Sequence, residues 1–243
     1  MYQSFYTGAL GAGSFLAKLS VVSNNLANIN NNGFKKESVE FADLLKYNLN
    51  DSEDAVTELM AGNGMRVQRT YSNFNSAAVT QTNGVLDFAI LQDRAFFMVQ
   101  DVGTEAITYT RSGHFHRGEL DGKFYLMTDS NRLVLDQNQQ PIELGQLEGE
   151  DLGEVREKVA LYTFEHPSRL LHVGDNEFAP QDEGAEPILI ESPMLATGAL
   201  ERSDTDMADE MVQVIQCQRA FSYALKVVNT ADEVESTINA LRS

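Results

Sequence analysis

Two segments with helical hydrophobic periodicity lie at opposite ends of the chain, and they constrain its fold more than any other feature. Near the N-terminus, apolar residues recur at intervals of four and three, at Phe15, Leu19, Val22, Leu26 and Ile29. Near the C-terminus, the apolar positions after Met207 include Met211, Val214, Phe221, Leu225 and Val228, again mostly three or four apart. This spacing is typical of a heptad seam, which buries one helix against another. Because glycine or asparagine interrupts these segments, we expect the two helices to stabilise each other.

Local signals mark where these helices stop and start. Asn32-Gly33 predicts the end of the first helix, since both residues tolerate a left-handed backbone. The following residues, 34–47, predict an extended stretch that leads into a short helix. Ser203 and Asp206 fit a capping box at the start of the C-terminal helix, with further acidic residues near its positive end.

The middle of the chain is predicted to be rich in β-strands. Short aromatic or β-branched segments occupy residues 85–90, 95–100, 106–111, 123–128 and 132–136, with turn residues between them. Residues 158–167 and 187–192 are further strand candidates, whereas the acidic segments 143–157 and 174–187 predict surface loops. Strands about ten residues apart favour an antiparallel meander that closes as a small barrel or sandwich.

Together these patterns predict an α+β fold, in which N- and C-terminal heptad helices form a coiled-coil module around an inserted, mainly antiparallel β domain. We expect residues 1–46 and 198–243 to form the helical domain. Residues 47–84 are then a variable linker or extension, and residues 85–197 a β-rich outer domain.

Composition narrows the classes of partner. The chain has 36 Asp and Glu against 18 Lys and Arg, a formal net charge of −18 over 243 residues. Such a charge argues against sequence-independent binding of nucleic acid and against docking on anionic lipid. No apolar run approaches the ~20 residues of a membrane helix, and the N-terminus has no basic segment typical of a Sec signal, so we expect no direct membrane insertion. By itself this pattern would indicate a cytosolic protein.

Candidate chemical sites are few. His114 and His116 could form a metal pair on one strand face, but no motif supplies further ligands, so solvated side chains are favoured. Residues 204–210 superficially resemble a calcium loop, yet helix capping explains their acidic residues better. Cys217, the one cysteine, lies in the C-terminal heptad pattern and is expected to be buried or interfacial rather than nucleophilic. We therefore expect no catalytic site, metal or cofactor, and a polymer subunit is favoured over an enzyme or a monomeric binding module.

Three segments in the same order resemble those of one known family. The first includes Asn24, Asn25, Leu26, Ala27, Asn28, Gly33, Phe34 and Lys35; the second includes Tyr109, Thr110, Arg111, Gly113 and Phe115; the third includes Gly198, Leu200, Glu201, Ser203, Glu210, Met211, Gln218, Arg219, Ala220, Thr230, Ala231 and Asp232. These match the signatures of bacterial flagellar axial proteins, the rod, hook and hook-associated subunits. One turn departs from the pattern, because residues 92–97 are QDRAFF where the family usually has GxGFF.

The resemblance implies a structural subunit of the flagellar basal-body rod, which polymerises helically into a hollow drive shaft that transmits torque and carries exported subunits. It implies a location in the basal body outside the cytoplasmic membrane, in the periplasm or cell-wall zone. Export through the flagellar type III apparatus would occur without a cleaved signal peptide. Its partners would be copies of itself, other rod and hook proteins and bushing rings around the rod. The chain length favours a rod protein over a hook or hook-associated subunit. The full NNLAN…NGFKK match and the GNGMRV passage at residues 62–67 favour the distal rod protein over the proximal one. A β-domain binding module with oligomerising helices is the alternative outside this family.

The expected functional residues fall into two sets. The subunit interface is expected along the helical seams, at Leu19, Val22, Leu26, Ile29, Met211, Val214, Phe221, Leu225 and Val228. The family signature is carried by Asn24, Asn25, Asn28, Gly33, Phe34, Gln218 and Arg219. We expect the amides of Asn24, Asn25 and Asn28 to flank the seam and to bond across a subunit boundary, since an amide both donates and accepts without adding charge.

Overall fold

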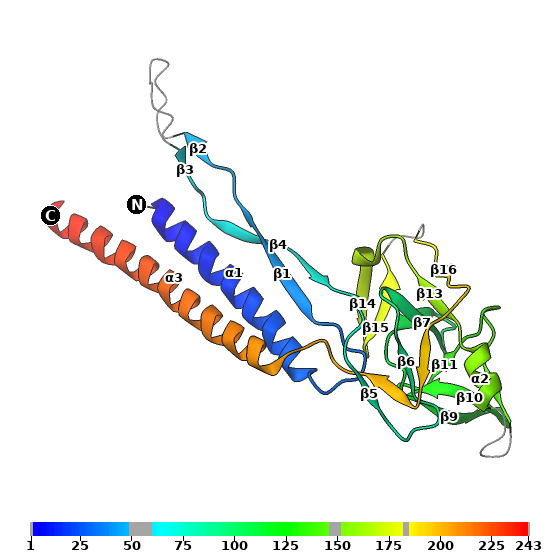
Figure 1. Ribbon diagram of the computed structural model, residues 1–243. Helices are drawn as coiled ribbons and strands as arrows, with labels where there is room; N and C mark the ends of the chain where they lie inside the picture. Colours follow the sequence, from blue (N-terminus) through cyan, green and yellow to red (C-terminus); the bar gives the residue numbers. More distant parts are fainter. Residues whose placement is uncertain (1, 49–59, 146–151, 182–184, 243) are drawn as a thin grey trace. The chain divides into compact units, whose positions relative to one another are not determined.

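The computed structural model describes residues 2–48, 60–145, 152–181 and 185–242. It has an α+β fold, with long helices at both ends and a mostly antiparallel β region between them (Figure 1). Contacts divide the chain into two units. The helical unit comprises Met1–Ala27, Glu37–Tyr71 and Asp206–Ser243, and the β unit comprises Asn28–Lys36 and Ser72–Thr205. The coiled-coil character of the helices and the domain boundaries expected from sequence stay predictions.

The helical unit is built from α1 (Tyr2–Ala27) and α3 (Met207–Arg242), which pack side by side and run in opposite directions (Figure 1). A long hairpin completes the unit: β1 (Glu37–Asp43) pairs with β4 (Met65–Ser72), and β2 (Tyr47–Asn48) pairs with β3 (Met60–Ala61). The extended stretch predicted after Gly33 is confirmed as β1. The short helix predicted to follow it is wrong, because the chain continues from β1 through Leu44–Lys46 into β2.

Asp206 sets the start of α3. Its Oδ1 accepts hydrogen bonds from the backbone N–H groups of Ala208 at 2.8 Å and Asp209 at 3.2 Å. These are N–H groups that have no partner within the helix, so the carboxylate acts as the N-cap. The predicted capping box does not form with Ser203 as the N-cap, because Asp206 takes that role. Ser203 Oγ instead accepts a hydrogen bond from Thr205 N–H.

The β unit contains a ten-stranded sheet and two smaller strand pairs. In the large sheet the order is β12-β10-β11-β7-β8-β15-β14, while β9 pairs with β10 and β13 pairs with both β7 and β16. The bounds are β5 Val79–Gln81, β6 Phe88–Ile90, β7 Ala95–Asp101, β8 Ile107–Thr110, β9 Phe115–Leu120, β10 Lys123–Thr128, β11 Arg132–Val134, β12 Glu143–Leu144, β13 Leu161–Thr163, β14 Leu170–Gly174, β15 Glu177–Pro180, β16 Ile188–Leu189, β17 Leu195–Thr197 and β18 Ala199–Glu201, with α2 at Leu152–Lys158 and a 3-10 turn at Pro167–Arg169. β17 pairs with β6, and β18 pairs with β5.

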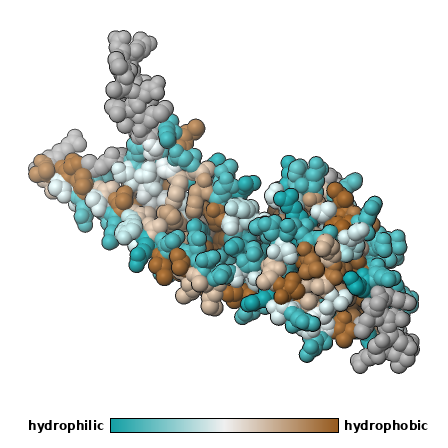
Figure 2. Space-filling view, viewed as in Figure 1, coloured by the Kyte–Doolittle hydropathy of each residue, from teal (hydrophilic) through white to brown (hydrophobic). Residues whose placement is uncertain are grey.

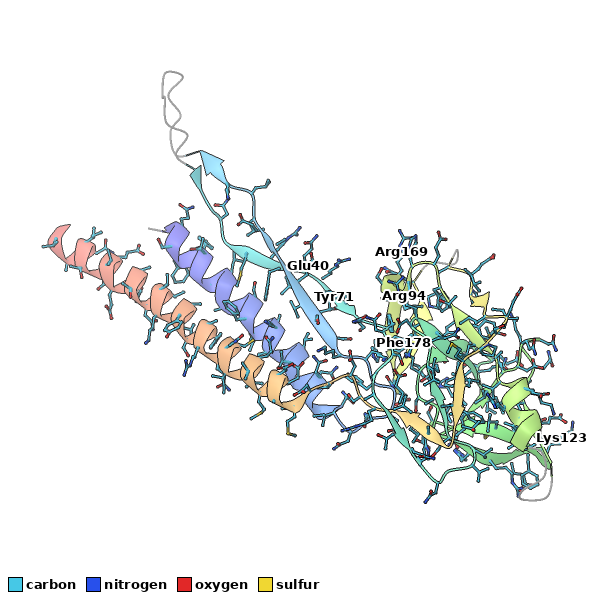
Figure 3. The ribbon with its side chains drawn as sticks, in the orientation of Figure 1. Glu40, Tyr71, Arg94, Lys123, Arg169 and Phe178 are labelled. Atoms are coloured by element: carbon cyan, nitrogen blue, oxygen red, sulfur yellow. The ribbon has the colours of Figure 1, made fainter. Side chains whose placement is uncertain are left out.

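Strand β7 lies at the centre of the core because both of its faces are covered. Phe97 and Val99 belong to one buried cluster, whereas Phe96 and Met98 belong to another. Phe178, labelled in Figure 3, packs with Phe96 in the second cluster, with ring centroids 5.9 Å apart. A strand buried on both faces has a continuous apolar run rather than an alternation, as residues 95–99 do.

The five principal strand predictions are confirmed by β6, β7, β8, β10 and β11, and short strands β13 and β16 occupy the two further candidates. The acidic segments predicted as loops are partly wrong. The first contains β12 and most of α2, and the second contains all of β15, which pairs with β8 and β14. Residues 146–151 and 182–184 of those segments lie outside the described residues.

Helix α1 also passes a simple test of length and hydropathy for a membrane span, at Gln3–Ala27. Core helices of soluble proteins and signal sequences pass the same test, so a single helix near the N-terminus is weak evidence.

Candidate functional site

The β unit contains a buried charge cluster formed by Lys35, Arg111 and Glu201. The Glu201 carboxylate accepts from Lys35 Nζ at 2.7 Å, from Arg111 Nε at 3.0 Å and from Arg111 Nη2 at 3.1 Å. All three side chains are at most 1% exposed. Each residue comes from a different segment of the sequence resemblance, so the three signatures meet at one carboxylate.

Backbone groups satisfy the rest of the cluster. Arg111 Nη1 donates to the carbonyls of Phe74 at 3.3 Å and Ala95 at 2.8 Å, and Nη2 donates to that of Gln92 at 3.3 Å. Lys35 Nζ also donates to the carbonyl of Asn75 at 2.6 Å. The four side-chain nitrogens of the two cations thus make seven hydrogen bonds to protein oxygens, as buried charges require.

Two cations share a single carboxylate in this cluster, so each cation lies close to another positive charge as well as to its counter-ion. Burial, and next the charge of Arg111, lower the pKa of Lys35 from its ordinary value; Glu201 and Asp204 act in the opposite direction. The N–H of Ala77 also donates to Glu201 Oε1 at 2.7 Å. The carboxylate therefore has four donors, and its removal would leave two buried cations without a counter-ion.

Main-chain bonds next to the cluster join the segment that follows α1 to the segment that precedes α3. Gly33 N–H donates to the carbonyl of Glu201 at 2.8 Å, and Asp204 N–H donates to that of Phe34 at 3.0 Å. Gly33 has φ +67°, and a Cβ there would lie 2.5 Å from the carbonyl oxygen of Arg111. Only glycine fits this position without strain. Gly33 and Phe34 of the predicted signature therefore have a structural role within the chain.

Gly113 makes a similar close approach in the second signature. Its carbonyl accepts from Phe88 N–H at 3.0 Å, and a Cβ on it would lie 1.6 Å from the Phe88 carbonyl oxygen. Residues 92–97, where the sequence differs from the family pattern, still form a tight turn. Arg94, labelled in Figure 3, has φ +56°, and its N–H donates to the Phe74 carbonyl at 2.8 Å. A non-glycine residue is thus held in the left-handed region there.

The helical unit places the predicted seam residues unevenly. Val22 is buried, and Leu19, Leu26, Val214, Phe221 and Val228 are half-buried. Met211 is 49% exposed and Leu225 is 41% exposed, so the expectation that they are buried between the two helices is not met within one chain. Ile29 lies beyond the end of α1 and is half-buried in the β unit. As a subunit interface, the seam stays a prediction.

Small residues lie in the contact between α1 and α3; the sequence pattern predicted the burial of Cys217 but gave the glycines no packing role. Cys217 is 2% exposed, and burial raises the pKa of its thiol. A Cβ on Gly8 would lie 2.9 Å from Val228 Cγ2 and 3.2 Å from the Ala224 carbonyl oxygen, and one on Gly11 would lie 3.9 Å from Ala224 Cβ. Small residues allow the helices to approach closely, so the glycines that weaken α1 have a packing role. The three-residue spacing of Gly8 and Gly11, which places both on one face of a helix, is the sequence signal that could have indicated this role.

The signature asparagines act inside the chain where their contacts are resolved. Asn25 is 2% exposed; its Nδ2 donates to the Glu37 carbonyl at 2.9 Å, and its Oδ1 accepts from Glu37 N–H at 2.9 Å. The expected subunit contact is therefore wrong for Asn25, whose amide ties α1 to β1. Asn28 Oδ1 accepts from Asn31 at 2.7 Å.

The remaining signature residues lie on the surface of a helix. Asn24 on α1 and Gln218 and Arg219 on α3 are exposed, which leaves all three accessible to other molecules.

The histidine pair does not form a site in the described residues. His114 Nδ1 lies 2.8 Å from Asp87 Oδ1, and its Nε2 lies 3.8 Å from Asp129 Oδ1. Among the residues that the structure describes, no group of three or more His, Cys, Asp or Glu side chains is arranged to hold a metal. The acidic residues near 204–210 are accounted for in part by the Asp206 cap.

Comparison with known proteins gives the same family at both ends of the chain. The model described as "Flagella basal body rod protein" matches residues 5–35, and the model "Flagellar basal body rod FlgEFG protein C-terminal" matches residues 196–241. Curated relatives cover the whole length between them. These matches support the flagellar basal-body rod protein family.

Three relatives illustrate the match to this rod family. The flagellar basal-body rod protein FlgG of Bacillus subtilis (strain 168) is 28% identical over 258 residues, covering 96% of this chain and 97% of the relative. FlgG of Borreliella burgdorferi is 28% identical over 280 residues, with 100% and 99% covered. FlgF of Mesorhizobium japonicum is 26% identical over 255 residues, also with 100% and 99% covered. Each family model extends into the β unit, and Lys35 and Glu201 of the charge cluster lie inside the matched segments.

Proposed function

We propose that the chain is a structural subunit of the flagellar basal-body rod and that it polymerises helically into a hollow shaft. The observation that carries this proposal is the junction of the three signature segments at Glu201, in a chain that aligns with rod proteins over its full length. The junction holds the two segments that flank the terminal helices against the β unit's own core.

In this proposal the terminal helices make the contacts between subunits, and the β unit forms the outer part of the shaft. Apolar side chains that are exposed in one chain, such as Met211 and Leu225, are then available to neighbours. Burying one large apolar side chain contributes about 1.5–3 kcal/mol, so several per subunit would support a stiff lattice. A coiled-coil arrangement of α1 and α3 fits their antiparallel packing.

The remaining expectations concern export and partners. We propose that the subunit leaves the cytoplasm through the flagellar type III export apparatus without a cleaved signal peptide. It would then assemble in the periplasm or cell-wall zone with copies of itself, with other rod and hook proteins and within bushing rings. The GNGMRV passage at residues 62–67 and the NNLAN…NGFKK segment favour the distal rod protein over the proximal one.

Deletion of the gene tests this function. We expect a deletion strain to make basal bodies with an incomplete rod and to be non-motile, and the full chain supplied in trans to restore both. Basal bodies with complete rods but no hook would instead assign the chain to the hook. Unchanged motility on deletion would contradict a flagellar role and favour a β-domain binding module.

A pair of substitutions tests the seam. Leu26→Asp places a charge at a half-buried position of α1, and we expect it to abolish rod assembly while the β unit unfolds at its usual temperature. Ser23→Asp adds the same charge at an exposed position one turn earlier and serves as the control. Assembly by Leu26→Asp at the efficiency of the control would refute the seam model.

A further inference from the structure

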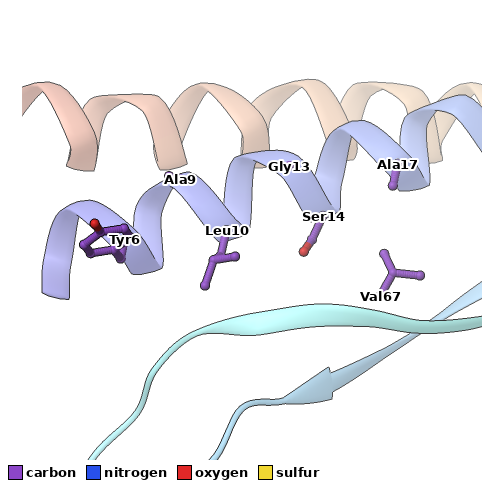
Figure 4. Close-up of a pocket in the computed structure, with 7 residues that line it drawn as sticks. All are labelled: Tyr6, Ala9, Leu10, Gly13, Ser14, Ala17 and Val67. Carbon is purple, nitrogen blue, oxygen red and sulfur yellow. The ribbon is translucent and has the colours of Figure 1, made fainter.

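The helical unit contains an apolar groove between α1 and strand β4. It is lined by Tyr6, Ala9, Leu10, Gly13, Ser14, Ala17 and Val67 and has a volume of about 370 Å³. Figure 4 shows Leu10 and Ser14 pointing from α1 towards β4, with α3 behind the opposite side of α1. None of the lining residues is charged, although the chain as a whole has a net charge of −18.

Gly13 is the residue of this groove that packing within the chain does not explain. A Cβ on Gly8 or Gly11 would meet α3, but a Cβ on Gly13 would have nothing within 4 Å. Glycine inside a helix costs about 1 kcal/mol relative to alanine. Gly13 therefore leaves open space on the α1 side of this groove.

Helix α3 presents a matching stripe of exposed side chains. Val227 is 48% exposed, Val234 43%, Ile238 44% and Leu241 83%. Tyr223 begins the stripe and has Lys226 Nζ 5.7 Å from its ring centroid. The atoms nearest to a Cβ on Gly8 of α1 belong to Ala224, Val227 and Val228, so Val227 borders the contact between the helices, and no other residue of the stripe is among these nearest neighbours. Figure 2 shows brown hydrophobic residues interspersed with teal hydrophilic ones on the visible side of this unit.

We propose that the stripe of α3 in one subunit docks into the α1–β4 groove of a second copy of this chain. The spacing supports the pairing: Tyr6, Leu10, Gly13 and Ala17 are four, three and four residues apart, and Val234, Ile238 and Leu241 are four and three apart. Equal heptad spacing lets side chains of one helix insert between those of another. Two chains of charge −18 repel each other, so they associate most readily through uncharged surfaces such as these.

This docking rests on the proposed rod function and adds the residues and the polarity of the contact. The groove and the stripe are different surfaces, so the contact is heterologous and leaves a free stripe at one end and a free groove at the other. Repetition of such a contact produces an open filament rather than a closed dimer. The same unit thus contains both halves of a polymerising interface.

Substitution at Gly13 tests the groove. Gly13→Leu fills this open space, and because nothing lies within 4 Å of the new Cβ, the monomer should keep its fold and its thermal unfolding temperature. We expect the protein concentration at which half of the chains are associated, measured by sedimentation at raised salt, to increase roughly tenfold or more. Ile238→Asp should have the same effect, whereas Ser236→Asp, the same charge at another exposed position of that turn, should not.

Mixing the variants distinguishes this contact from a general loss of association. Gly13→Leu retains its stripe and Ile238→Asp retains its groove, so an equimolar mixture should form a one-to-one heterodimer and nothing larger. In a Cys217→Ala background, Gly13→Cys mixed with Ile238→Cys should form a disulfide between chains. A mixture that stays monomeric and does not cross-link would overturn the proposal.

Other outcomes separate this inference from the proposed function. If Gly13→Leu polymerises normally and restores motility, the docking contact is wrong and the rod function stands. If the wild-type chain neither associates nor restores motility, the rod function fails as well. Binding of neutral lipid vesicles that Gly13→Leu abolishes, without any self-association of the wild-type chain, would assign the groove to a membrane surface and overturn the proposal.

Discussion

Neutralising Glu201 should destabilise the chain far more than neutralising an acid in an exposed ion pair. Glu201→Gln keeps the shape of the side chain but removes the counter-ion of both Lys35 and Arg111, which are 0% exposed. The new amide nitrogen cannot accept from the cations, so donors that bonded one carboxylate oxygen lose their partner. Breaking a buried ion pair in this way costs about 3–5 kcal/mol.

The chain supplies a matched control for this measurement. Lys123 Nζ, labelled in Figure 3, lies 2.7 Å from Glu143 Oε1, the same distance as between Lys35 and Glu201, but both side chains are more than half exposed. Exposed pairs contribute about 0–1 kcal/mol, so Glu143→Gln should leave stability almost unchanged. The two variants differ in burial and not in the chemistry of the substitution.

Thermal unfolding followed by circular dichroism provides the assay. For a chain of this size about 2–4 °C corresponds to 1 kcal/mol, so Glu201→Gln should lower the unfolding temperature by roughly 6–20 °C. Lys35→Met should cost less, because it leaves Arg111 and Glu201 as a one-to-one pair. An unfolding temperature for Glu201→Gln within 2 °C of that for Glu143→Gln would refute the argument that burial makes this carboxylate important.

Three further predictions follow from individual contacts. Asn25→Ala removes both bonds to the Glu37 backbone and should cost about 1–3 kcal/mol in urea unfolding, whereas Ser23→Ala on the exposed face should change stability by no more than about 0.5 kcal/mol. Gly33→Ala should destabilise by at least about 1–2 kcal/mol, because φ is +67°, while Gly13→Ala should stabilise the monomer by about 0.5–1 kcal/mol; equal effects in calorimetry would contradict the packing argument. Burial raises the pKa of Tyr109 to about 12, so the unfolded chain loses this proton at lower pH than the folded chain does. The free energy of unfolding should therefore fall by about 3 kcal/mol between about pH 10 and 12. Tyr109→Phe should reduce that fall, as measured by denaturation at each pH.

The helices and main strands could be predicted because they follow hydrophobic periodicity, but the contact between the helices could not. The pattern emphasises large apolar residues, and it selected Met211 and Leu225, which are exposed. The contact instead uses Ala224 and Gly8, since small residues permit close approach. Hydropathy alone does not distinguish a helix face that packs through small side chains from one that packs through large apolar ones.

The β14–β15 hairpin was hidden by its composition. Acidic residues and glycine predicted a loop at 174–187, yet Glu177 is 2% exposed in β15. Its carboxylate accepts from Thr108 Oγ1 at 2.7 Å, and Arg132 Nε lies 2.6 Å from it. A carboxylate can be buried in a strand only when such partners surround it. These partners are far away in the sequence, so the local composition does not indicate them.

The charge cluster shows what the signatures themselves could and could not reveal. Lys35 and Arg111 are 166 and 90 residues from Glu201, so a single sequence gives no reason to pair them. Buried ion pairs often add little net stability over apolar residues of similar volume. Their geometry is more demanding, however, because the two Arg111 bonds and the Lys35 bond fix where three chain segments meet. An apolar junction would tolerate a shifted register between residues 33–35 and 199–201. The charged one does not, because a shift would leave two buried cations unpaired. A fully buried charge cluster therefore fixes the position of these end segments more strictly than apolar packing would.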